Sequence, residues 1–85
     1  MAYQVQLSKK SEKFIDSLDR KTADRILAAL TKLEENPYPT GCLKIVGSEY
    51  DYRIRVGDYR VVYQIQEAVL VVFVIRIGHR KDIYR

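Results

Sequence analysis

The stretch YRIRVGDYRVVY, residues 52–63, predicts a tight β-hairpin. Apolar and polar residues alternate on both sides of Gly57-Asp58, a dipeptide that favours a two-residue hairpin turn. With that turn, Arg55 lies directly opposite Arg60, and the tyrosines and aliphatic residues fall on the other face. The hairpin therefore separates an apolar face, which helices can cover, from a face that carries these two arginines and Arg53.

The pairing of Arg55 with Arg60 is unfavourable in an ordinary sheet. Like charges directly opposite each other on one sheet face cost roughly a few tenths to 1 kcal/mol. An anion bound to this face would offset the repulsion, and arginine offers a rigid, permanently charged fork suited to phosphate. The same side chains also suit a solvated outer face without a ligand. Three converging arginines favour the phosphate-binding interpretation.

The composition is that of one small globular domain with a modest basic excess. The chain has 85 residues, of which 47% are hydrophobic and 31% charged, so we expect a single α+β domain over residues 1–85. Fifteen Lys and Arg against eleven Asp and Glu give a net charge of +4, and six of the eight arginines lie in residues 44–85. This uneven distribution makes a polyanionic partner the first hypothesis.

The sequence argues against several kinds of functional site and against a membrane or secreted location. One cysteine, Cys42, and one histidine, His79, leave no internal disulfide and no Cys/His zinc site. The longest apolar stretch, residues 68–75, is far shorter than the roughly 18 residues of a membrane span. The N-terminus has no basic stretch followed by an apolar run, so we expect a cytoplasmic protein. Nucleophile elbows, Gly-rich phosphate loops and metal-binding carboxylate clusters are absent from the sequence.

The segments around the hairpin complete the predicted fold. Ser8 and Asp19 suit the N-caps of two helices, and the second helix ends before Pro37 because the residue before proline avoids the helical conformation. We expect these helices to form a hairpin with one apolar face. The predicted elements, in order, are a strand at 3–7, helices at 9–18 and between 19 and 36, a short extended piece at 43–45, and strands at 50–56, at 59–64 or 59–65, and at 69–77.

The last strand leaves one side chain unplaced. Residues 69–75 are apolar at every position, which is typical of a central strand covered on both faces. A two-residue second turn would put Arg76 on the apolar face, whereas a three-residue loop, such as residues 66–68, would put it with the other arginines. Both alternatives stay open, and Arg76 is not included in the candidate site.

The run GHRKDIYR, residues 78–85, follows this strand and is rich in reactive side chains. His79 can exchange protons near neutral pH, Arg80 can neutralise a phosphoryl oxygen, and Tyr84 can stack on a base or transfer a proton. A frayed, charged terminus would have the same composition. The residues alone leave both interpretations open.

Four segments together resemble the RelE family of bacterial and archaeal toxins: YRIR at 52–55, DYRVVY at 58–63, VFV at 72–74 and GHRKDIY at 78–84. The Tyr-Arg-x-x-Tyr strand combined with the terminal Gly-His-Arg-x-x-x-Tyr run is more diagnostic than either piece alone. The likeness extends along the whole chain. It implies a microbial-RNase-like RelE fold, with an N-terminal strand, a helical hairpin and a mainly antiparallel sheet.

The resemblance implies a toxin of a type II toxin–antitoxin system that acts as a ribosome-dependent mRNA endonuclease and inhibits translation. Such toxins enter the A site of the 70S ribosome, where the 2′-hydroxyl of the mRNA attacks the adjacent phosphate. No metal or other cofactor is expected. The implied partners are a cognate antitoxin, RelB-like or other, the 70S ribosome and its mRNA, and operator DNA only through the antitoxin. No membrane partner is expected.

The family's functional residues match positions in this chain. By resemblance, Arg60 and Arg80 hold the scissile phosphate and stabilise its developing charge, and Tyr84 stacks on the substrate and serves as general base in some members. The implied catalytic residues are Arg55, Arg60, His79, Arg80 and Tyr84. The implied RNA-binding and phosphate-binding residues are Arg53, Arg55, Arg60, Arg80 and Lys81.

The chain departs from the family pattern at Arg53 and Arg55. Well-studied members often have lysines there, one of which is proposed as the general acid for the leaving oxygen. A guanidinium stays protonated at physiological pH and is a poor proton donor, so Arg55 can stabilise charge but not supply the proton. His79 becomes the candidate proton donor.

Two other functions fit the same fold. A ParE-like toxin poisons DNA gyrase and cuts no RNA, and a non-catalytic relative would only bind an antitoxin or operator DNA. Gyrase toxins often lack the combination of a basic strand with the terminal Arg/Tyr set. That combination favours the nuclease.

Overall fold

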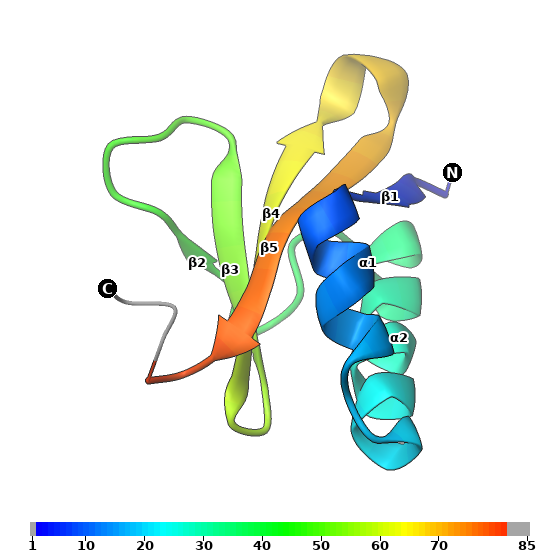
Figure 1. Cartoon of the computed structure of the whole chain (residues 1–85). Coiled ribbons are helices and arrows are strands. Elements are labelled where there is room, and N and C mark those ends of the chain that lie inside the picture. The colour runs from blue at the N-terminus through cyan, green and yellow to red at the C-terminus, as the bar shows by residue number, and fades with distance from the viewer. Residues whose placement is uncertain (1, 82–85) are drawn as a thin grey trace.

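Two α-helices pack on one face of a five-stranded sheet in the computed structural model, which describes residues 2–81 (Figure 1). The strand order is β1-β5-β4-β3-β2, with β1 parallel to β5 and the other pairs antiparallel. The predicted α+β class and mainly antiparallel sheet are confirmed. The elements are β1 (Gln4–Leu7), α1 (Lys9–Asp16), α2 (Arg20–Glu35), β2 (Leu43–Lys44), β3 (Asp51–Val56), β4 (Tyr59–Gln66), the 3-10 turn η1 (Glu67–Val69) and β5 (Val71–His79).

Both helices begin at the predicted caps. The Ser8 side chain accepts a hydrogen bond from the Ser11 N–H at 3.1 Å, and Asp19 accepts one from the Thr22 N–H at 3.2 Å. Hydrogen bonds from the Thr22 side chain and backbone lower the pKa of Asp19 from its ordinary 3.8. α2 ends two residues before Pro37, as the steric effect of proline on its predecessor requires. Within residues 2–81, neither helix is long and apolar enough to cross a membrane.

The core fills the space between the helices and one face of the sheet. Tyr63 is fully buried there, and its hydroxyl donates to the Pro37 carbonyl at 2.8 Å, so its polar atom has a partner. Burial raises the pKa of Tyr63. Each large aliphatic side chain buried in this way contributes about 1.5–3 kcal/mol. The buried members are Ile15, Ile26, Leu30, Leu33, Ile54, Val61, Tyr63, Ile65, Val72, Val74 and Ile77.

The turn between β3 and β4 has the predicted length and register. Gly57 adopts a φ of +60°, a left-handed conformation that favours glycine at the first central position of a two-residue hairpin turn. A Cβ at this position would also lie 3.3 Å from the Arg25 guanidinium of α2. The strands pair Val56 with Tyr59, as expected from the sequence. This local geometry fixes which side chains of the hairpin share a face.

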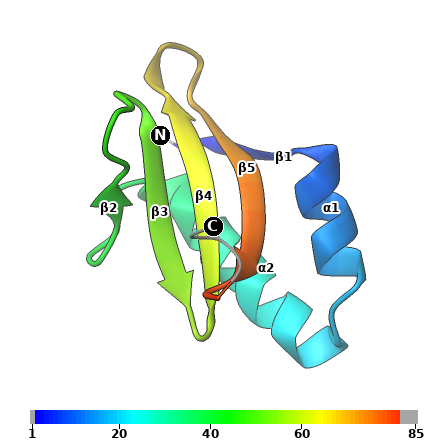
Figure 2. The same cartoon turned by 60° about the vertical axis from the view of Figure 1, so that its left-hand side comes forward.

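The connection between β4 and β5 differs from the prediction. β4 continues to Gln66, η1 follows, and Leu70 takes a left-handed φ of 54°, so β5 begins at Val71 instead of residue 69. β5 lies between β1 and β4, which confirms its central position. The expected cover on both faces is wrong, because both α-helices of the described chain lie on the same side of the sheet (Figure 2).

Candidate nucleic-acid interface

The face of the sheet opposite the helices carries four arginines from three adjacent strands. β3 contributes Arg53 and Arg55, β4 contributes Arg60, and β5 contributes Arg76. Arg55 pairs with Arg60, and Val62 pairs with Arg53 on one side and Arg76 on the other. Directly paired residues point to the same side of a sheet. We call these four arginines the arginine face.

Three of the four arginines line one depression. The depression has a volume of about 190 Å³ and is bounded by Arg53, Arg55 and Arg60, together with Gly41 and Leu43. The Leu43 side chain is 54% exposed, so an apolar surface adjoins the positive charges. Cationic groups beside an apolar surface suit a nucleotide, whose phosphate is charged and whose base is flat and largely apolar.

The hairpin backbone tethers two of these guanidinium groups. Arg55 Nε donates to the Gly57 carbonyl at 3.3 Å, and Arg60 Nη1 donates to the Tyr59 carbonyl at 3.2 Å. A guanidinium has five N–H donors, and the Arg55 hydrogen bond uses one of them. The pair of like charges predicted from the sequence is therefore present, with its side chains held near the turn.

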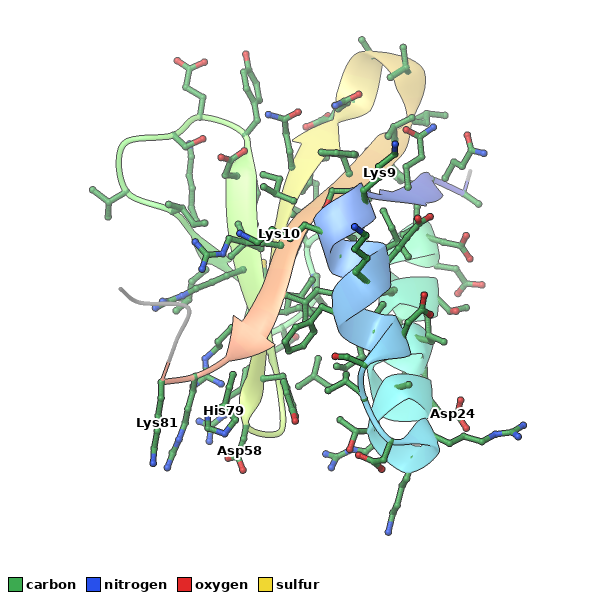
Figure 3. All side chains as sticks on the ribbon, viewed as in Figure 1. Lys9, Lys10, Asp24, Asp58, His79 and Lys81 are labelled. Atoms are coloured by element: carbon green, nitrogen blue, oxygen red, sulfur yellow. The ribbon has the colours of Figure 1, made fainter. Side chains whose placement is uncertain are left out.

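The end of β5 brings Arg80 to the same turn. The Arg80 N–H donates to the Asp58 carbonyl at 2.8 Å, which extends the ladder between β4 and β5 by one hydrogen bond. Lys81 follows as an exposed residue, and Figure 3 shows it with His79 and Asp58 at this end of the sheet. Arg80 thus follows the strand that carries Arg76 and lies beside the turn that joins the other basic strands.

His79 is not brought to the arginine face. It pairs with Tyr59, whose ring lies 6.0 Å from the Phe14 ring of α1, so this side of β4 and β5 faces the helices. The His79 ring meets the Tyr59 ring edge-on at 5.6 Å, and its Nδ1 accepts a hydrogen bond from the Lys81 N–H at 3.3 Å. Strand alternation separates His79 from Arg60, which follows Tyr59 on the opposite side.

Tyr84 lies outside the described residues 2–81, and its stacking and general-base roles stay predictions. Of the other predicted residues, the structure brings Arg53, Arg55 and Arg60 together and sets Arg80 at the adjoining turn.

Arg76 is the basic residue that sequence analysis left out. The register between β4 and β5 shifts between Val62 and Tyr63, and β5 accommodates Ile75 as an extra residue, a β-bulge. Without the shift, Arg76 would pair with Val61 and point toward the helices. The alternation of polar and apolar residues contains no signal for this bulge, because the preceding residues of β5 are all apolar.

Comparison with known proteins identifies the family. The model of the ParE toxin of the type II toxin–antitoxin system parDE matches residues 5–84. The chain belongs to the RelE/ParE family of type II toxins. Within this family, an Escherichia coli protein described as a RelE-like toxin is 29% identical over an alignment of 87 residues. The alignment covers 99% of this chain and 92% of that protein.

Solved RelE structures share the fold of this RelE/ParE toxin. The archaeal RelE of the RelE–RelB complex from Pyrococcus horikoshii matches with a TM-score of 0.85 and 30% identity, covering 96% of this chain and 99% of that chain. A variant of Escherichia coli toxin RelE in the free state matches with a TM-score of 0.83 and 27% identity, covering 99% and 90%. The resemblance to RelE toxins seen in the sequence is confirmed, and the protein is a RelE-like toxin.

Proposed function

We propose that this toxin is an endoribonuclease that cuts mRNA in the ribosomal A site and so inhibits translation. The observation that carries the proposal is the depression lined by Arg53, Arg55 and Arg60, with Arg80 at the adjoining turn. Permanent positive charges grouped in this way suit the phosphate backbone of RNA. Membership of a family that includes RelE toxins supports the same assignment.

The proposed reaction is a transesterification at one phosphodiester. The 2′-oxygen loses its proton and bonds to the adjacent phosphorus, the bond from phosphorus to the 5′-oxygen breaks, and that oxygen takes up a proton. The products are a cyclic phosphate and a free 5′-hydroxyl. Arg55, Arg60 and Arg80 would stabilise the negative charge that grows on the phosphoryl oxygens, and losing one such donor typically costs about 10²–10³ in rate.

The proton-transfer roles stay predictions. Tyr84 is the proposed general base and base-stacking residue, and Lys81 is a proposed phosphate contact. His79 is the proposed proton donor, although its ring lies on the helix side of β5, against Tyr59. If His79 donates the proton, His79→Gln slows cleavage more at low than at high pH, because only the imidazolium has that proton to give. A loss of equal size at every pH would fit its packing against Tyr59 and reject the donor role.

The proposed partner in the cytoplasm is a cognate antitoxin, which would also link the toxin to operator DNA. A groove of about 430 Å³ lies between α2 and β3, with apolar walls at Leu33, Pro39 and Ile54 and positive charge at Lys32 and Arg55. An acidic, amphipathic antitoxin segment would complement it. Solved neighbours from Pyrococcus horikoshii and Escherichia coli are complexes of RelE with RelB. High-yield purification of the unaltered chain from healthy cells without any partner would contradict this assignment.

A second candidate is inhibition of DNA gyrase, which the ParE name of the matching family model favours. Primer extension on cellular messages after brief induction separates the two. We expect discrete cuts within translated regions and none in a reporter message whose start codon is removed. Intact messages with a DNA-damage response would show that the protein is a gyrase toxin and not a nuclease. Intact messages without toxicity would show that it is a non-catalytic binding module.

A further inference from the structure

We propose that Arg76 is a fourth phosphate-binding residue of this interface and that Ser8, on the opposite side of the sheet, keeps it there by holding the β-bulge. The inference rests on the proposed function and deepens it.

The register places Arg76 within reach of the same ligand as Arg53. Val62 is the Cα partner of both residues, so the two arginines lie on one face with a single strand between them. Neighbouring strands are about 4.8 Å apart, which sets their Cα atoms about 10 Å from each other. Arg53 and Arg76 thus lie on either side of β4. Arg60 lies on the same face of β4, two residues from Val62. A chain of phosphates crossing the strands would meet all three.

The charge of Arg76 is not neutralised within the described chain. No hydrogen bond or ion pair joins its guanidinium to another of residues 2–81, although the side chain is half-buried. Asp51 is the one carboxylate on this face of β3, β4 and β5, and it accepts a hydrogen bond from Gln64 at 3.4 Å. A half-buried arginine in such surroundings is suited to an external anion.

The bulge that presents Arg76 is held by the start of α1. The Ser8 hydroxyl donates to the Ile75 carbonyl at 2.8 Å, and the Ser8 N–H donates to the Val74 carbonyl at 3.0 Å. The Ser11 side chain is fully buried, and its hydroxyl donates to the Val74 carbonyl at 3.3 Å. The Ser8 hydroxyl thus satisfies the carbonyl of Ile75, the extra residue at which the β4–β5 register shifts.

The same contacts fix the direction of the Arg76 side chain. A one-residue slip of a strand turns every side chain to the other face. The extra residue in β5 produces such a switch between Val74, which is fully buried on the helix side, and Arg76. Ser8 is therefore a positioning residue that acts through Arg76.

The phosphate contact is tested by equilibrium binding to 70S ribosomes that hold an mRNA with 2′-deoxynucleotides in the A-site codon, so that no cleavage occurs. We expect Arg76→Gln to weaken binding and to reduce the slope of log affinity against log salt by about 0.7–0.9, the effect of losing one phosphate contact. The matched control is Arg20→Gln, which removes the same charge from an exposed position of α2.

Two outcomes separate this inference from the proposed function. If Arg60→Gln weakens binding but Arg76→Gln behaves like Arg20→Gln, the Arg76 contact is overturned and the proposed function stands. If the unaltered chain shows no salt-dependent binding to these ribosomes, the proposed function fails and the inference fails with it.

The positioning role is tested with two substitutions of Ser8 in a double-mutant cycle with Arg76→Gln. Ser8→Gly removes the hydroxyl but leaves a residue that is well tolerated at an N-cap, whereas Ser8→Thr keeps the hydroxyl. We expect Ser8→Gly to weaken ribosome binding in the unaltered chain and to have no effect when Arg76 is already Gln, and Ser8→Thr to restore binding. An equal loss in both backgrounds would overturn the positioning role.

Discussion

On β4 and β5, Val61 and Ile77 point toward the helices, whereas their sequence neighbours Arg60 and Arg76 lie on the other side of the same strands. The apolar side follows the rules of a protein core, with nearly complete burial of each side chain. The arginine face violates the rules of an ordinary sheet, since it pairs like charges across β3 and β4. Adjacent residues thus serve stability and ligand binding separately, and substitutions can test the two apart.

The arginine face can tolerate its repulsion because the core stabilises the fold more strongly. The like-charge pair of Arg55 with Arg60 costs about 1 kcal/mol or less. One buried aliphatic side chain contributes about 1.5–3 kcal/mol, which exceeds that cost. Local sequence choices that conflict with the fold are expected at functional sites, and here the conflict falls where the phosphate is proposed to bind.

The largest expected effect on stability is at Ile77, between Arg76 and Gly78. Ile77→Ala should lower the free energy of unfolding by about 2–5 kcal/mol, because it leaves a cavity in the core. Urea denaturation measures the loss, and cleavage per folded molecule should stay at the level of the unaltered chain. A variant of unchanged stability that has lost its activity would break the proposed division between the two faces.

A smaller effect on stability, of opposite sign, is expected at Arg55 on the other face of the sheet. Arg55→Gln removes one member of the like-charge pair and should raise the free energy of unfolding by a few tenths to about 1 kcal/mol, while mRNA cleavage falls. The gain should shrink as salt screens the repulsion. Arg20→Gln, which disrupts a 3.9 Å contact with Asp24, should give no such gain. A loss of stability in Arg55→Gln would show that the pairing is not repulsive.

The smallest expected effect concerns Asp19, which caps the helix that covers the core. Its pKa is lowered in the folded chain by hydrogen bonds from Thr22, so its charge stabilises the fold above pH 3.8 and this contribution is lost as the pH falls below that value. Asp19→Asn keeps a capping oxygen but cannot titrate. The difference in unfolding free energy between the two chains should be constant near neutral pH and shrink in acid. A difference that does not change with pH would contradict the assigned cause.

Local signals in the sequence were sufficient to predict the hairpin and the caps. Gly57-Asp58 sets the register of β3 with β4 through a two-residue turn, and Ser8 and Asp19 cap their helices with their own side chains. The path from β4 to β5 was not predictable in the same way. Leu70 adopts a left-handed conformation there, which non-glycine residues rarely take, so its residue type does not indicate the turn.

The position of Arg76 depends on contacts between distant parts of the chain. The bulge at Ile75 is held by Ser8, 67 residues away, so no pattern within β5 could reveal it. His79 was predicted as part of a terminal run, but β5 continues through it, and alternation then turns its side chain toward Tyr59. Tertiary contacts decide the length and register of β5. These two features set the positions of Arg76 and His79, which the sequence alone could not predict.

The arginine face is proposed to bind and stabilise the scissile phosphate of mRNA. Single-turnover cleavage of ribosome-bound mRNA by the unaltered chain, Arg60→Gln and Arg20→Gln tests this role most directly, with circular dichroism to confirm that each variant is folded. We predict that Arg60→Gln cuts about 10²–10³ times more slowly than the unaltered chain and that Arg20→Gln cuts at the unaltered rate. A folded Arg60→Gln variant that cuts at the rate of the unaltered chain would contradict the account.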